Sequence, residues 1–100
     1  MEYRCETRSD RFVVSISGIL TFHDHIEFRK IMTEFSECAP MKIEFSLATM
    51  QMIDSAGIGM LLLANDKAGQ IGKSLCLTGV TGHVAKIVEL AKVDRVISIE

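Results

Sequence analysis

Along this 100-residue chain, segments with the hydrophobic period of a strand alternate with segments that have the hydrophobic period of a helix. Few protein folds fit such a pattern. Residues 41–47 alternate apolar and polar side chains with period two, which predicts a strand with one buried face. From Asp24 to Ala39 the apolar residues recur at the i, i+3, i+4 spacing of a helix, and Pro40 predicts the end of that helix. Strands that alternate with helices favour an α/β fold with some parallel strand pairs.

The remaining segments continue this alternation. Asp24, followed three residues later by Glu27, predicts the N-cap of the first helix. A second helix is expected to begin near Ser55, after a loop, and to end at Gly69 or Gly72. The other predicted elements are an edge strand at 3–7, a turn at 8–11, a strand at 12–17 closed by Gly18, a strand at 74–78, a helix from Thr81 through Ala91 and a short strand at 96–99. We therefore expect one domain over residues 1–100, a mixed sheet of four or five strands with three to four helices packed mainly on one face.

The charge balance and the cysteine count exclude several classes of protein. Lys and Arg number 11 against 13 Asp and Glu, and the formal charge is −2, so no surface for nucleic acid is expected. The apolar runs fall short of the ~20 residues of a membrane span. The charged N-terminal segment 1–6 lacks the apolar core of an export signal. Three cysteines in no framework spacing are typical of a reducing compartment, so we expect a cytoplasmic protein.

The stretch from Met50 to Gly59 carries the strongest functional signal. Ser55 lies at or next to the start of the second helix, and two interpretations stay open. Its hydroxyl caps the helix, or the free N–H groups and the helix dipole there seat a phosphate on it. A phosphoserine adds about −1.5 to −2 of charge beside Asp54, which would make Ser55 a switch. Gly57 and Gly59 carry no side chains and would let the backbone of a partner approach.

Three further features are less specific. His23 and His25 flank Asp24, but no cysteine or carboxylate cluster follows at a metal-binding spacing, so we expect neither a metal nor a cofactor. Ser55 lacks the nucleophile elbow and the oxyanion motif of a hydrolase, so we expect no enzyme. Three methionines around the switch are predicted either to fill the core or to form an adaptable contact surface: Met50, Met52 and Met60.

The segment Ile53-Asp54-Ser55-Ala56-Gly57-Ile58-Gly59 resembles the phosphoacceptor signature of STAS domains, the fold of bacterial anti-sigma factor antagonists. Gly18-Ile19-Leu20 is similar to the Gly-x-Leu that leads from the second strand of that fold into its first helix. Residues 72–77 and 84–99 are similar to the strand after the signature helix and to the closing helix and strand. The resemblance thus covers residues 10–99 in order. Thr21 and Ser46 stand where sigma-regulating members commonly carry aspartates.

This resemblance implies a partner-switching protein that acts as a monomer or a weak dimer. The unphosphorylated domain would bind an anti-sigma factor that is a serine kinase of the histidine-kinase-like ATPase type. Phosphorylation of Ser55 would release it, and a PP2C-type phosphatase would restore binding. The implied partner-binding residues are Thr21, Phe22, His23, Asp54, Ser55, Ala56, Gly57, Ile58, Gly59 and Met60.

A second hypothesis uses the same surface without a switch. STAS-like components of transporters or lipid-trafficking complexes use this surface permanently. The protein would then be a constitutive assembly subunit, and Ser55 would have only a structural role.

Overall fold

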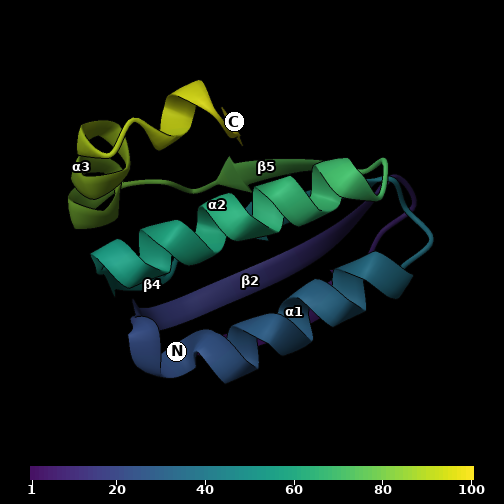
Figure 1. Ribbon diagram of the computed structural model, residues 1–100, viewed down its shortest axis with the longest axis horizontal. Helices are drawn as coiled ribbons and strands as arrows, with labels where there is room; N and C mark the ends of the chain where they lie inside the picture. The colour runs from purple at the N-terminus through teal and green to yellow at the C-terminus, as the bar shows by residue number, and fades with distance from the viewer.

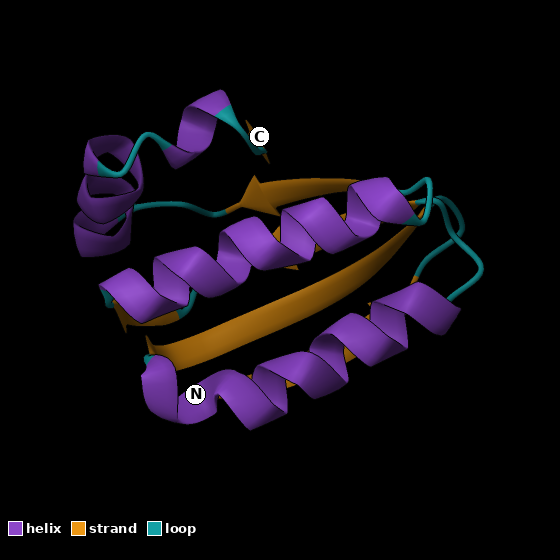
Figure 2. Cartoon of the chain, viewed as in Figure 1, coloured by secondary structure: helices purple, strands orange, loops and turns teal.

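Six strands and three helices make up the computed structural model, which describes all 100 residues (Figures 1 and 2). The strands are β1 (Glu2–Thr7), β2 (Arg11–Leu20), β3 (Lys42–Ser46), β4 (Met50–Ile53), β5 (Ser74–Thr78) and β6 (Ser98–Ile99). The helices are α1 (His25–Glu37), α2 (Ser55–Gln70) and α3 (Gly82–Leu90), with short 3-10 turns at Phe22–Asp24 and Val93–Arg95. The predicted α/β fold is confirmed.

The strands lie in the order β1-β2-β3-β5-β6, and β4 pairs with β2 off this path. Only β1 is antiparallel to its neighbour, and all other pairs are parallel. Five strands follow the prediction, whereas β4 is a sixth, in a segment expected to be a loop. Met50 and Ile53 are buried, while the two residues between them are exposed. Because buried and exposed residues do not alternate, this segment lacks the period-two pattern from which a strand is predicted.

Strand β2 is longer than predicted because Gly18 continues it. Gly18 has a φ of +81°, a value that L side chains rarely adopt, and the pairing of β2 with β4 shifts register between Gly18 and Ile19. The glycine therefore bends the strand and carries it on to Leu20. The residues after this bulge pair with β4.

Helices α1 and α2 cover one face of the sheet, as Figure 1 shows. Phe45 of β3 is fully buried at the centre of this layer, with the rings of Phe28 and Phe35 from α1 at centroid distances of 6.0 and 6.1 Å. The opposite face is mostly polar, with the buried Val13 and Cys76 on either side of Glu44. There Glu44 accepts hydrogen bonds from Arg11 and from the Thr78 hydroxyl, both at 2.8 Å. No helix has the combination of length and apolarity that crossing a bilayer requires.

Both ends of helix α1 and the start of the last strand differ from the prediction. Asp24 occupies the N-cap position of α1, but its carboxylate makes no capping bond to that helix, so the predicted pairing with Glu27 is wrong. Helix α1 stops at Glu37, because Cys38 is already extended two residues before Pro40. The last strand shortens to Ser98–Ile99, since Val93–Arg95 coil into a 3-10 turn. Thr81 precedes α3 as expected, although its side chain makes no capping bond.

The C-terminal end of α1 is held by a lysine from a distant part of the chain. Lys73, just before β5, donates from Nζ to the carbonyl oxygen of Phe35 at 2.9 Å, to that of Cys38 at 2.5 Å and to the Cys38 sulfur at 3.2 Å. These carbonyls have no partner within the helix, and they carry the negative end of its dipole. One ammonium thus satisfies the end of α1 and ties it to the sheet.

We predict that Lys73→Met lowers the free energy of unfolding by about 1–3 kcal/mol, because charged hydrogen bonds to the α1 carbonyls are lost. Lys67→Met is the matched control: Lys67 makes no side-chain hydrogen bond or ion pair, and its replacement should change stability by less than ~0.5 kcal/mol. Urea unfolding followed by circular dichroism measures both. Equal stabilities for the two variants would contradict the role of Lys73.

Candidate functional site

The first turn of α2 is capped by Asp54. Its carboxylate Oδ1 accepts from the N–H of Gly57 at 2.7 Å, and its carbonyl accepts from the N–H of Ile58 at 3.0 Å. The N–H of Asp54 in turn donates to the carbonyl of Leu20, at the end of β2, at 3.2 Å. One residue therefore both caps the helix and joins it to the sheet.

Ser55 is the first residue of α2, and it is exposed. Its hydroxyl makes no hydrogen bond, so the interpretation in which Ser55 caps the helix is wrong; Asp54 does so instead. The N–H groups of Ser55 and Ala56 point out of the first turn without a backbone acceptor. An exposed hydroxyl thus stands beside unpaired donors at the positive end of a 16-residue helix, an arrangement that favours negative charge.

The two glycines of the signature have different environments. A Cβ on Gly57 would lie 2.7 Å from the carbonyl oxygen of Leu20 and 2.6 Å from Cγ1 of Ile53, so the buried Gly57 allows α2 to pack closely on β2 and β4. A Cβ on Gly59 would meet nothing within 4 Å. The expected approach of a partner is therefore open at Gly59, whereas Gly57 lies beneath the surface and serves internal packing.

The loop after β2 begins beside the same point. It follows Leu20, the residue that accepts from Asp54, and Figure 1 shows α1 and α2 starting at the same end of the sheet. Phe22 is 57% exposed and stacks on the ring of His25 at 5.0 Å. His23 is exposed as well, while Thr21 is half-buried. Of the three predicted contact residues in this loop, Phe22 and His23 are therefore accessible to a partner, and Thr21 is accessible only in part.

Asp24 shapes this loop. Its carboxylate accepts from the N–H of Thr21 at 2.9 Å and from the amino group of Met1 at 3.0 Å. Burial raises the pKa of this carboxyl, but the hydrogen bond from Thr21 and the hydrogen bond and charge of the amino group outweigh it, so the pKa lies below its ordinary value. His25 Nδ1 lies 2.9 Å from the carbonyl oxygen of Phe22. No group of three or more His, Cys, Asp or Glu side chains converges as a metal site anywhere in the structure.

An apolar groove runs from Ser55 to α3. Its volume is about 430 Å³, and its walls come from the start of α2 and the end of α3: Ile53, Asp54, Ser55, Ile58, Ile87, Leu90 and Ala91. Leu90 is 78% exposed, the most exposed large apolar side chain of the protein. The apolar stripe of this helix in the sequence is Val84, Ile87, Val88 and Ala91, and it does not include Leu90. Leu90 lies off the apolar stripe of α3, and this displacement was the available signal of a second apolar surface.

The three methionines divide between core and surface. Met50 is buried, Met60 is half-buried, and Met52 is 48% exposed. Met52 pairs in register with Ile19 of β2, which is 46% exposed. Met52 and Ile19 thus add two apolar side chains to the surface near Asp54.

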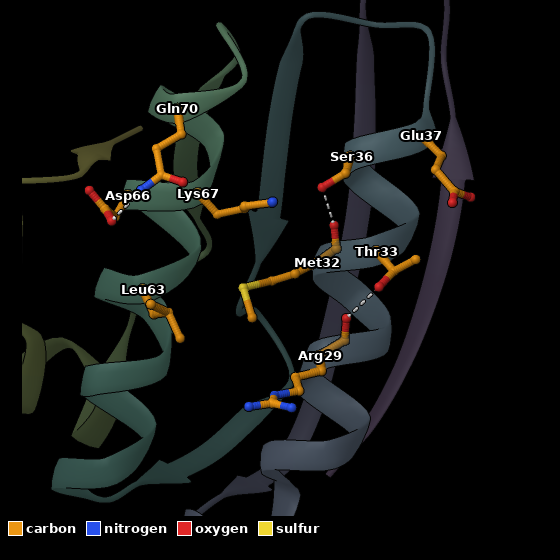
Figure 3. A pocket seen from close by; sticks show the side chains of 9 residues that line it. All are labelled: Arg29, Met32, Thr33, Ser36, Glu37, Leu63, Asp66, Lys67 and Gln70. Carbon is orange, nitrogen blue, oxygen red and sulfur yellow. Dashed lines mark hydrogen bonds between the residues drawn. The ribbon is translucent and has the colours of Figure 1, made fainter.

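A second groove lies between α1 and α2, further along both helices (Figure 3). It has a volume of about 420 Å³; Arg29 and Met32 extend towards it from α1, and Leu63 and Lys67 line it from α2. None of the signature residues lines it. Nothing in its mixed lining identifies an occupant.

The family model described as "Mlab, STAS domain" matches residues 4–98. The chain belongs to the STAS domain family. This match runs from within β1 to the first residue of β6 and includes the Asp54–Ser55 signature. The sequence resemblance is thereby confirmed over nearly the full chain.

Solved STAS structures share the fold at low sequence identity. TM1081 of Thermotoga maritima is 19% identical, with a TM-score of 0.86 over 97% of this chain and 84% of that one. The unphosphorylated anti-sigma factor antagonist SpoIIAA is 18% identical, with a TM-score of 0.80 over 99% and 88% of the two chains. A sulfate transporter family protein from Wolinella succinogenes is 18% identical, with a TM-score of 0.68 over 80% and 65%. The fold of this chain is thus found both in an anti-sigma factor antagonist and in a sulfate transporter family protein.

We predict that Gly57→Ala destabilises the STAS domain by about 1–3 kcal/mol, because the added methyl group collides with the backbone of β2. Gly59→Ala is the control. It meets open space inside a helix, where alanine is favoured over glycine by roughly 0.5–1 kcal/mol, so it should stabilise the protein. Thermal and urea unfolding measure both. A Gly57→Ala variant as stable as Gly59→Ala would contradict the close packing of α2.

We also predict that Asp24 stabilises the folded protein and that this contribution to the free energy of unfolding is lost in acid. Its pKa is lowered in the folded state, so its stabilisation is complete above the ordinary value of 3.8 and is lost as the pH falls from there through the folded pKa. Asp24→Asn should therefore be less stable than the parent at neutral pH, and the difference should shrink in acid. Urea unfolding across the acid range tests this, with Asp94→Asn as an exposed control. A difference independent of pH would contradict it.

Proposed function

We propose that this STAS domain is an anti-sigma factor antagonist-like regulator that switches partners through Ser55. In the unphosphorylated state it binds an anti-sigma factor that is also a serine kinase of the histidine-kinase-like ATPase type. Phosphorylation of Ser55 releases it, and a PP2C-type phosphatase restores binding. The observation that carries this proposal is the exposed Ser55 hydroxyl, which has no partner because Asp54 caps the helix.

The geometry supports a phosphate at Ser55. A kinase reaches the hydroxyl without unfolding the helix, since no bond within the protein has to break. The unpaired N–H groups of Ser55 and Ala56 and the helix dipole then stabilise the phosphate in place. SpoIIAA, whose fold this chain shares, has been solved in a phosphorylated form as well, with a TM-score of 0.72 to this chain. Phosphorylation is thus compatible with this fold.

The surroundings of Ser55 explain how a phosphate would release a partner. Ser55 and Asp54 stand at the rim of the apolar groove that ends at Leu90. A partner that covers this rim must exclude water from it, and a group of about −1.5 to −2 charge beside the Asp54 carboxylate resists such burial. The phosphate therefore destabilises the complex without altering the fold.

The proposed contact surface extends over three segments: the loop after β2, the start of α2 and the end of α3. It consists of the residues implied by the family, apart from Gly57, which is buried and lines no groove, and of Leu90 on the α3 side; Ile58 is also buried but lines the groove. The surface residues are Thr21, Phe22, His23, Asp54, Ser55, Ala56, Ile58, Gly59, Met60 and Leu90. Phe22 and Leu90 are the large exposed apolar side chains on this surface. Side chains of this kind anchor protein interfaces when they enter a pocket of the partner.

A second candidate is a constitutive assembly subunit of a transporter or lipid-trafficking complex. The similarity to the Wolinella sulfate transporter family protein favours it, as do Thr21 and Ser46 at positions where sigma-regulating members carry acids. The same surface would then be covered permanently. Ser55 would remain unmodified in that case.

We predict that Ser55→Asp weakens binding to the cognate ATPase-type kinase at least about tenfold, because it places charge at the rim of the groove. Ser55→Ala should keep the affinity within about threefold, since its hydroxyl makes no bond in the free protein. Isothermal titration calorimetry with the purified kinase measures both. Ser9→Asp, in the turn at the other end of β2, adds the same charge away from the surface and should bind as the parent does.

Incubation with the same kinase and ATP should place one phosphate on Ser55, as detected by mass spectrometry of tryptic peptides. Ser55→Ala should receive none. Equal affinity of the Asp and Ala variants, together with an unmodified Ser55, would refute the switch and support the constitutive subunit.

A further inference from the structure

Strand β1 forms one edge of the sheet, and half of its backbone groups face away from the molecule. The N–H of Arg8 donates to the carbonyl of Arg11 across the hairpin turn at 2.8 Å, and β1 and β2 pair without a shift from that point. Because an antiparallel ladder alternates, Glu2, Arg4 and Glu6 bond to β2 like Arg8. The N–H and C=O groups of Tyr3, Cys5 and Thr7 therefore point to the free edge.

The side chains of β1 alternate in charge along this edge. Glu2, Arg4, Glu6 and Arg8 occupy every second position, so they share the face of the sheet opposite to the helices. Arg8 pairs with Glu6 at 2.9 Å in an exposed contact. Glu2 and Arg4 make no ion pair and no side-chain hydrogen bond. The row thus has the order minus, plus, minus, plus, with two members unpaired.

We propose that β1 binds β1 of a second copy of this chain as an antiparallel strand pair, with the two-fold axis at Cys5. In this register Arg4 faces Glu6 of the second copy, and Glu2 faces its Arg8. Symmetry repeats both contacts, so four pairs of opposite charges form on one face. Tyr3, Cys5 and Thr7 supply the backbone hydrogen bonds, Tyr3 of each copy with Thr7 of the other.

The charge pattern selects this register over its neighbours. With the axis at Arg4, two arginines would face each other and Glu2 would face Glu6, and with the axis at Glu6, two glutamates would meet. Like charges directly opposite destabilise a strand pair. An axis at Tyr3 or Thr7 keeps opposite charges together but shortens the overlap. An axis that passes between two residues places the backbone N–H and C=O groups of the free edge opposite residues whose own groups already bond to β2. No hydrogen bonds form between the two copies in that register.

The side chains on the face of the sheet that carries the helices limit the affinity between the two copies of β1. Glu34 of α1 lies over β1, with Oε2 at 3.5 Å from the Cys5 sulfur, so the proposed axis brings two Glu34 carboxylates towards each other. A pair of six-residue strands also buries less than the ~1,200 Å² of a stable interface. A weak, reversible dimer follows. Ser55 lies outside it, because α2 starts from β4, which pairs with β2 and not with β1.

Charge exchange tests the register by sedimentation equilibrium over a wide range of protein concentrations. Arg4→Glu or Glu6→Arg alone should weaken the dimer about tenfold, since each creates two repulsive contacts. The double variant Arg4→Glu/Glu6→Arg should restore it, because opposite charges again face each other. Glu34→Gln should strengthen it. Arg29→Glu, which changes the same charge in the groove between α1 and α2, is the control and should leave it unchanged.

Amide hydrogen exchange measured by NMR locates the same contact. The amides of Tyr3, Cys5 and Thr7 should gain protection as the protein concentration rises, while those of Arg4 and Glu6, already bonded to β2, should not. A protein that stays monomeric at the highest NMR concentration would overturn the proposal. So would single and double charge variants of equal affinity, or protection that appears on residues outside β1.

Discussion

The close contact between the first turn of α2 and the end of β2 determines where the functional residues lie. Gly57 permits it because a side chain there would collide with the Leu20 carbonyl, and Asp54 fastens it with a bond on each side. The loop with Phe22 departs from Leu20, and Ser55 stands one residue beyond Asp54. Both predicted contact segments thus start from one anchored point on the sheet.

The rest of the molecule gives this point a rigid support. Phe45 and the rings around it fill the layer beneath the helices, and Lys73 holds the far end of α1. The face without helices carries an ionic network around Glu44 rather than an apolar patch. The two proposed binding surfaces therefore lie at the end of the sheet where α2 begins and at the charged edge of β1.

Periodicity predicted much of this fold from the sequence, because strand 42–46 and the stripe of α1 each bury one face, whereas strand 74–78 is buried on both faces and was indicated by the glycines on either side of it. It did not predict β4, a four-residue strand whose pairing depends on the bulge at Gly18. The signature motif indicated Ser55. It did not show that Asp54 caps the helix or that Leu90 adjoins the site, since both depend on tertiary contacts that no local pattern records.

The division of labour between Asp54 and Ser55 has an evolutionary consequence. Since the cap bond belongs to Asp54, the hydroxyl of Ser55 makes no hydrogen bond within the folded protein. A substitution that removes this hydroxyl therefore leaves the capping of α2 intact. Under the proposed function, a lineage would therefore gain or lose the switch by substitution at this single position, with the scaffold unchanged.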